Sequence, residues 1–220
     1  MGLWTIIRED FETVKQRDPA TQSALAVWLL HTGFWAVVHY RIQHFLWSHG
    51  FRGLSRWLSV ISRWLTGVEI HPAMRAGRRL FIDHGMGIVI GETAELGDDV
   101  SIYQGVTLGG TSWQQGKRHP TIGNNVILGA GAKVIGAIKV GDGARVGSNA
   151  VVVKEVAAGA TVVGIPARAV GKQAPHDEAK RFESYAQGSD TPDPVRELLE
   201  QMNNRIHALE EELKQLKGKA

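Results

Sequence analysis

An aliphatic residue recurs every six positions through the middle of the chain, from about Val89 to Val156. The residues of this period are Ile90, Leu96, Ile102 and Leu108, and then Ile122, Leu128, Val134, Val140, Val146 and Val152. A helix needs apolar residues every three or four positions and a half-buried strand needs strict alternation, so a period of six fits neither. It is typical of short strands joined by tight corners, and three such strands would close one triangular coil of about eighteen residues.

Glycine directly follows several of these aliphatic residues, as in Ile90-Gly91, Leu96-Gly97 and Leu108-Gly109. We expect these glycines to permit corners with a positive φ. The pattern resembles the hexapeptide-repeat acyltransferases, whose domain is a left-handed parallel β-helix. The handedness is implied by the resemblance alone, because parallel crossovers are normally right-handed.

The six-residue register is broken twice. A first run of the period ends at Ile82, and the frame then slips by two residues. The second break separates Leu108 from Ile122, fourteen residues apart where six are expected. We expect the excess, residues 109–120, to leave the coil as a loop, and such a loop is often where function lies.

Helical periodicity precedes and follows the repeat. The expected N-terminal helices cover residues 1–17, 23–33, 34–49 and 54–66. Asp18-Pro19 ends the first of them, because a residue before proline avoids the α region. This part of the chain holds six of the seven Trp residues, which we interpret as core or subunit contacts rather than a cofactor site.

The C-terminal segment is expected to be a polar linker followed by a helix. Residues 173–194 are polar and contain three Pro. Beyond them, apolar residues alternate in two heptad rows: Val195, Met202, Leu209 and Leu216, with Leu199, Ile206 and Leu213 between them. This spacing predicts a short coiled coil of roughly three heptads, and a single amphipathic helix is the alternative.

The fold class expected is therefore mainly β, a left-handed parallel β-helix with helical additions at both ends. The expected domains are an N-terminal α-helical domain (1–66), a left-handed parallel β-helix (67–171), and a linker with a C-terminal helix (172–220).

Composition excludes several classes of function. The net charge of +3 is too small to indicate a nucleic-acid partner. The absence of cysteine excludes disulfides, a thiol nucleophile and a thiolate metal site. The apolar stretch around residues 24–38 is interrupted by His31 and is shorter than the ~20 residues of a membrane span. No signal peptide is apparent, so we expect a cytoplasmic protein with no membrane partner.

Two polar residues, Asp83 and His84, stand where the register first slips. Glu69 lies fourteen residues before Asp83, about one coil, so we expect its carboxylate to approach His84. A carboxylate beside an imidazole fixes its tautomer and supports the imidazolium, and imidazole titrates close to neutral pH, which suits a general base. The alternative is a histidine that only caps a corner.

The loop at residues 109–120 ends with Arg118 and His119. A guanidinium offers a planar fork of donors that matches a carboxylate. The alternative is a solvated loop arginine without a ligand.

A set of short motifs resembles the serine O-acetyltransferase family. They are Arg17-Asp18-Pro19-Ala20, Glu69-Ile70-His71-Pro72, Ile82-Asp83-His84-Gly85, Gly91-Glu92-Thr93-Ala94, Thr107-Leu108-Gly109-Gly110-Thr111, Arg118-His119-Pro120 and Gly129-Ala130-Gly131-Ala132-Lys133. The resemblance covers about residues 17–172. Any one motif is weak, but the set in this order is specific.

The resemblance implies transfer of acetyl from acetyl-CoA to the L-serine hydroxyl, giving O-acetyl-L-serine and CoA in cysteine biosynthesis, without a metal. It implies His84 as the general base, with Glu69 as its partner where many members have Asp. The substrate-binding positions it implies are Asp18 and Asp83 at the serine amino group and hydroxyl, and Arg118 and His119 at the carboxylate. The positions whose backbone meets coenzyme A are Gly110 and Ala130.

Family members place the active site between neighbouring subunits of a trimer, so the resemblance implies that Glu69 and His84 face Arg118 of the partner subunit. Members that form hexamers have a longer helical N-terminus, so with about 66 residues before the repeat we expect a trimer. The chain ends at Ala220 rather than in a tail with a terminal Ile, so no complex with O-acetylserine sulfhydrylase is expected. L-cysteine is implied as a feedback inhibitor at the serine site.

Three alternatives remain open on the residues alone. The first is another hexapeptide O-acetyltransferase, acting on a sugar or other hydroxyl. The second is a γ-type carbonic anhydrase, which needs three histidines around zinc, where the repeat offers His71, His84 and His119 without a close pair. The third is a non-catalytic assembly scaffold built around the coiled coil.

Overall fold

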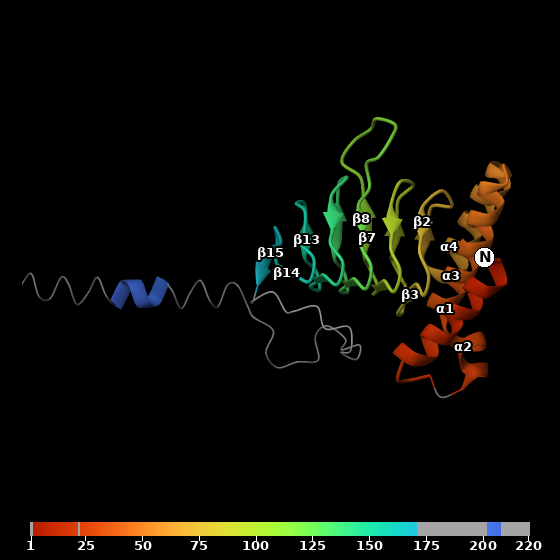
Figure 1. Ribbon diagram of the computed structural model, residues 1–220, viewed down its shortest axis with the longest axis horizontal. Helices are drawn as coiled ribbons and strands as arrows, with labels where there is room; N and C mark the ends of the chain where they lie inside the picture. The colour runs from red at the N-terminus through yellow and green to blue at the C-terminus, as the bar shows by residue number, and fades with distance from the viewer. Residues whose placement is uncertain (1, 22, 171–201, 208–220) are drawn as a thin grey trace, which may run out of the picture. The chain divides into compact units, whose positions relative to one another are not determined.

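The computed structural model describes residues 2–21, 23–170 and 202–207. The chain divides into two compact units, residues 1–187 and 188–220. In the second unit the described residues 202–207 are helical, and the remainder of the expected linker and coiled coil lies outside the described residues. In the first unit, four helices cover one end of a prism of short strands (Figure 1).

Fifteen short strands form three sheets in the described part of the chain. The first sheet contains β1 (Glu69–Ile70), β4 (Val89–Ile90), β7 (Thr107–Gly109), β10 (Lys133–Ile135) and β13 (Val151–Val152). The second contains β2 (Arg75–Ala76), β5 (Glu95–Leu96), β8 (Thr121–Ile122) and β11 (Lys139–Val140). The third contains β3 (Phe81–Ile82), β6 (Ser101–Ile102), β9 (Ile127–Leu128), β12 (Arg145–Val146), β14 (Thr161–Val163) and β15 (Arg168–Val170).

Most strands pair in parallel with the strand three places later, which closes the three-sided coil that the six-residue period predicts. Between β7 and β8, residues 110–120 leave the prism as the predicted loop (Figure 1). The exception to the parallel pattern is β15, which pairs antiparallel with β14. The repeat did not predict this final strand.

The aliphatic residues of the repeat fill the inside of the prism. Side chains that are at most 1% exposed include Ile90, Leu108, Leu128 and Val134, together with the smaller Ala94, Val100, Ala132 and Ala144 that follow such residues at a distance of four. Burial of one Ile or Leu side chain stabilises a fold by about 1.5–3 kcal/mol, so the column of aliphatic residues is the main stabilising element.

The expected reason for the corner glycines is wrong. Gly129 and Gly141, which directly follow aliphatic residues of the period, are not among the residues with positive φ. A Cβ on Gly129 would lie 2.7 Å from the backbone nitrogen of Ser148, and one on Gly141 would lie 2.5 Å from that of Ala158. These glycines are required because the next coil passes too close for a side chain. Positive φ occurs later in the corners, as at Gly105 and Asn125.

The helices are α1 (Leu3–Arg17), α2 (Ala24–Leu30), α3 (Thr32–Ser48) and α4 (Arg52–Thr66). The sequence predicted that the second helix reaches Gly33, but α2 ends at Leu30. His31 then caps α3, because its Nδ1 accepts the backbone N–H of Phe34 at 3.0 Å. Gly33 therefore lies inside α3, where a Cβ would come within 2.0 Å of the carbonyl oxygen of Ile82.

A buried ion pair fixes the helices on the first coil. The Arg41 guanidinium donates to both carboxylate oxygens of Asp10, at 2.9 and 3.2 Å, and to the carbonyls of Ala76 and Gly77. Asp10 also accepts the backbone N–H of Leu80 at 3.0 Å. Since every contact joins a helix to the first coil or to another helix, the pair sets the position of the helices relative to the prism.

The apolar face of α4 points outward. Its buried side chains are Ser55, Ser59, Ser62 and Thr66, whereas Trp57 and Trp64 are 61% and 85% exposed. Within this chain these Trp residues are not core, which leaves the subunit contact as the prediction for them. No described helix combines the length and apolarity needed to cross a membrane.

Candidate active site

His84 lies in the corner that connects β3 to β4, where the sequence register slips. The corner is left-handed at three positions, with φ of 59° at His84, 88° at Gly85 and 77° at Gly87. The left-handed conformation costs a residue with a side chain roughly 1–2 kcal/mol, so neighbouring contacts must hold it. One such contact is the N–H of Gly87, which donates to the carbonyl of Gly67 at 2.9 Å.

Glu69 and His84 line the same pocket, a cavity of about 670 Å³ between this corner and α4. The His84 side chain is 71% exposed, and its Nε2 lies 3.8 Å from Oδ1 of Asp83. The Glu69 carboxylate pairs with Arg63 of α4 at 2.9 Å. We call this cavity the His84 pocket.

The spacing argument that placed Glu69 one full coil from His84 is wrong. The residue one coil after Glu69 is Val89, with which it pairs in register. His84 instead stands at the corner before β4, and Glu69 at the start of β1. The corner brings both side chains to one pocket because the start of each first-sheet strand lies at this edge of the prism.

Asp18 and His31 lie near the same corner. Asp18 Oδ2 accepts the Thr21 hydroxyl at 2.6 Å and lies 3.8 Å from Nε2 of His31. Burial lowers the pKa of His31. The negative charges of Asp18 and Asp83 act in the opposite direction and raise this pKa, whereas His84 lowers it further. These interactions gather Asp18, His31, Asp83 and His84 in one region. Sequence reasoning treated His31 only as an interruption of an apolar stretch.

Arg118 and His119 end the loop and line a second cavity of about 750 Å³, together with Glu92, Thr93 and Gly110. We call it the Arg118 pocket. The Arg118 guanidinium donates to the Glu92 carboxylate at 2.5 Å, and this hydrogen bond lowers the pKa of Glu92. Arg118 is therefore held in place by a carboxylate of its own chain.

Thr93 organises the turn at His119. Its hydroxyl oxygen accepts the backbone N–H groups of Arg118 and His119 at 3.0 and 3.1 Å. Its own N–H donates to Nδ1 of His119 at 3.2 Å, so the proton of the neutral ring is on Nε2. Burial lowers the pKa of His119. Glu92 and Thr93 had no assigned role in the sequence, although they lie inside one of its motifs.

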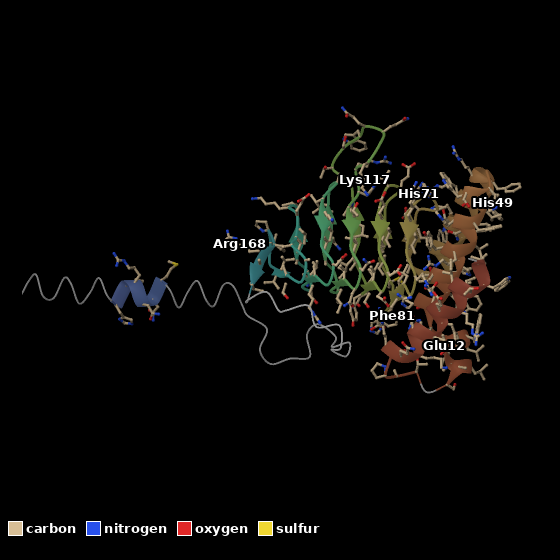
Figure 2. The ribbon with its side chains drawn as sticks, in the orientation of Figure 1. Glu12, His49, His71, Phe81, Lys117 and Arg168 are labelled. Atoms are coloured by element: carbon tan, nitrogen blue, oxygen red, sulfur yellow. The ribbon has the colours of Figure 1, made fainter. Side chains whose placement is uncertain are left out.

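The two pockets lie at opposite ends of the first-sheet strands. His84 precedes β4, whereas the loop that carries Arg118 follows β7. Figure 2 shows His71 and Lys117 on the side of the prism where the loop leaves, and Phe81, just before the His84 corner, on the other side. One chain therefore separates the predicted site residues into two groups.

The two positions expected at coenzyme A divide in the same way. Gly110 lines the Arg118 pocket. Ala130 lies two coils along the edge that carries His84, where corners are joined by the hydrogen bonds from Gly105 N–H to the Met86 carbonyl and from Gly131 N–H to the Gln104 carbonyl, at 2.9 and 2.8 Å.

The three histidines of the zinc alternative also lie on two edges within the chain. His71 is influenced by the charges of Arg118 and His119, whereas His84 belongs to the other pocket. Across residues 2–21, 23–170 and 202–207, no three His, Asp or Glu side chains form a group that could hold a metal ion.

Comparisons with known proteins identify the family. A family model described as bacterial transferase hexapeptide (six repeats) matches residues 119–154. The serine acetyltransferase of Bacillus pumilus is 46% identical over 97% of this chain and 93% of its own length. That of Mycobacterium tuberculosis is 53% identical over 78% of this chain and 75% of its own length.

Solved structures agree. The Neisseria gonorrhoeae serine acetyltransferase in complex with serine superposes with a TM-score of 0.74 at 41% identity, covering 77% of this chain and 69% of that one. A serine acetyltransferase in complex with cysteine gives 0.76 at 41% identity, covering 81% and 68%. The predicted left-handed parallel β-helix is thereby confirmed. The chain belongs to the serine acetyltransferase family and is an acyltransferase.

Proposed function

We propose that this chain transfers the acetyl group of acetyl-CoA to the hydroxyl of L-serine, giving O-acetyl-L-serine and CoA as a step of cysteine synthesis. The observation that carries the proposal is the division of the polar residues into two pockets. One holds a carboxylate and an imidazole suited to proton transfer, and the other an arginine and a histidine suited to a carboxylate ligand. Together they supply what an amino-acid acceptor needs.

His84 is the general base of the proposed reaction. It takes the hydroxyl proton while the serine oxygen attacks the thioester carbonyl, and it returns that proton to the CoA sulfur when the C–S bond breaks. Glu69 stabilises the imidazolium formed in between, in the manner of the carboxylate of a catalytic triad. A backbone N–H, such as that of Gly110, stabilises the oxyanion.

The remaining residues hold serine. The Arg118 guanidinium has five N–H donors, so it can bind the serine carboxylate while it keeps Glu92. Nε2–H of His119 is a second donor to the same carboxylate. Asp18 and Asp83 bind the ammonium and hydroxyl groups of serine. A positively charged acceptor requires such carboxylates, whereas a sugar does not.

The complete site is shared between subunits of a homotrimer. Because the His84 and Arg118 pockets lie at opposite ends of the first-sheet strands, a single chain cannot close them around one small acceptor. A cyclic arrangement can place the His84 pocket of one subunit against the Arg118 pocket of the next. Coenzyme A then lies between Ala130 of one subunit and Gly110 of the partner subunit. The outward Trp face of α4 supports the proposal, because exposed apolar patches mark interaction surfaces.

The decisive assay measures CoA thiol release from acetyl-CoA with L-serine, maltose or chloramphenicol as the acceptor. We expect release with L-serine alone, and competition by L-cysteine, which carries a thiol in place of the hydroxyl. Release with a sugar and not with L-serine would indicate the other hexapeptide acetyltransferases. No release, with no thermal shift on adding CoA, would indicate a scaffold.

A further inference from the structure

The N-terminal end of α3 contacts two proposed site residues that are distant in sequence, Asp18 and His84. His31, directly before the helix, faces Asp18 in the segment after α1. Thr32, the first residue of the helix, donates its hydroxyl proton to the carbonyl of His84 at 3.1 Å. Gly33 lies against the carbonyl of Ile82. A three-residue segment therefore joins the helical region to the corner that carries the proposed base.

The Thr32 hydrogen bond acts on a backbone that needs support. His84 is left-handed, and so is Gly85 after it. The peptide that joins them supplies the carbonyl that Thr32 binds. Thr32 also lines the His84 pocket. By fixing the orientation of this peptide, the hydroxyl supports the left-handed backbone from which the His84 imidazole projects.

The His31 imidazole is fixed on both sides. Its Nδ1 accepts the Phe34 N–H, so the proton of the neutral ring is on Nε2 and faces Asp18. The side chain is 9% exposed and lies against the Phe81 ring, with centroids 6.0 Å apart. Burial lowers the pKa of His31, so at neutral pH the ring directs an N–H toward Asp18 without adding a cation that would compete with an ammonium group.

We propose that Thr32 and His31 are positioning residues for the acceptor side of the site. Thr32 holds the backbone of His84, and His31 orients the Asp18 carboxylate toward the substrate ammonium. The inference rests on the proposed function. Neither residue reacts with substrate, so loss of Thr32 should lower kcat and loss of His31 should raise the KM for serine.

For Thr32, the test compares Thr32→Val, which keeps the shape, with Thr32→Ser, which keeps the hydroxyl. Loss of one hydrogen bond predicts a kcat about threefold to tenfold lower in Thr32→Val, with the KM for acetyl-CoA unchanged and the melting temperature lowered by no more than about 2–4 °C. Thr32→Ser should restore kcat. Wild-type kcat in Thr32→Val, or equal losses in both variants, would overturn the role of the hydroxyl.

For His31, the test uses His31→Asn, because the Asn carbonyl oxygen can still accept the Phe34 N–H but lacks the Nε2 donor. We expect its KM for serine to rise about twofold to fivefold at unchanged kcat and KM for acetyl-CoA, as for the loss of one electrostatic contact with the Asp18 carboxylate. The control is Ser23→Ala, which removes the cap of α2 and should lower only the melting temperature.

An unchanged KM for serine in His31→Asn would overturn the positioning role of His31 and leave it a helix cap. These results are distinct from failure of the proposed function, which would appear as a wild-type chain that releases no CoA with serine. That result would overturn this inference as well.

Discussion

At the scale of single residues, the proposed chemistry depends on side chains that the fold holds in unusual positions. His84 is exposed and left-handed, and Glu69 already has Arg63 as a partner. Arg118 is in turn paired with Glu92. Each reacting or binding group therefore has a defined neighbour whose loss can be measured separately.

Replacement of the proposed base should reduce turnover without loss of fold. His84→Asn is the appropriate variant, because Asn tolerates a positive φ and leaves the corner unstrained. We expect kcat to fall about 10²–10⁴-fold, the usual effect of losing a general base. The melting temperature should stay at the wild-type value. A kcat near wild type would remove His84 from the mechanism.

Replacement of Arg118 should act on serine binding. Arg118→Lys keeps the charge but loses the planar fork, so we expect the KM for serine to rise at least tenfold, about 1.4 kcal/mol of binding. The KM for acetyl-CoA in the same variant is the internal control. An unchanged KM for serine would show that the carboxylate binds elsewhere.

Acidification should destabilise the chain through the half-buried His71. Burial lowers the pKa of His71 from 6.5 to about 4, so between these values the unfolded chain binds a proton that the folded chain does not, and stability falls as the pH falls. His71 is partly exposed, which limits the effect to about 1 kcal/mol, or about 2–4 °C in Tm. Thermal melts from pH 7 to pH 4 measure it.

His71→Asn is the matched variant for these melts. It keeps an acceptor for the Ala73 N–H that Nδ1 of His71 now binds at 3.1 Å, but it does not titrate. Its melting temperature should depend less on pH than that of the wild type. Equal pH dependence in the two proteins would contradict the assignment to His71.

At the scale of elements, the six-residue period predicted the strands because each aliphatic residue of the period must point into a narrow core. Breaks in the period are also visible in the sequence, and the segments at these breaks contain His84 and Arg118. The period could not show why glycine follows these aliphatic residues, since the reason is the close approach of the next coil's backbone to the glycine. It also could not reveal His31, Thr32, Glu92 and Thr93, whose contacts join segments distant in sequence.

Alanine at a corner glycine should distinguish close approach from backbone conformation. In Gly141→Ala the new Cβ would meet backbone atoms of Ala158, so we expect the free energy of unfolding to fall by about 1–3 kcal/mol. Gly53→Ala in α4 is the control, because it meets nothing within 4 Å. Chemical denaturation of both variants measures the difference, and equal stabilities would contradict the packing explanation.

At the scale of the whole molecule, the prism separates two groups of residues that the proposed reaction needs together. The sequence predicted both groups through its resemblance to a family. The structure places them at opposite ends of the first-sheet strands, since His84 precedes β4 and the loop with Arg118 follows β7. Neither sequence period nor a single chain determines how subunits meet. The proposed activity therefore depends on assembly of the subunits as much as on any single residue.

Mixed trimers test this claim most directly. His84→Ala and Arg118→Ala chains, carrying different affinity tags, are co-expressed, and assemblies with both tags are purified. If each site takes His84 from one subunit and Arg118 from the next, every mixed trimer contains one intact site, so the account predicts about one third of the wild-type kcat/KM for serine per trimer. A kcat/KM for serine no higher than that of the two parent variants would contradict the shared site.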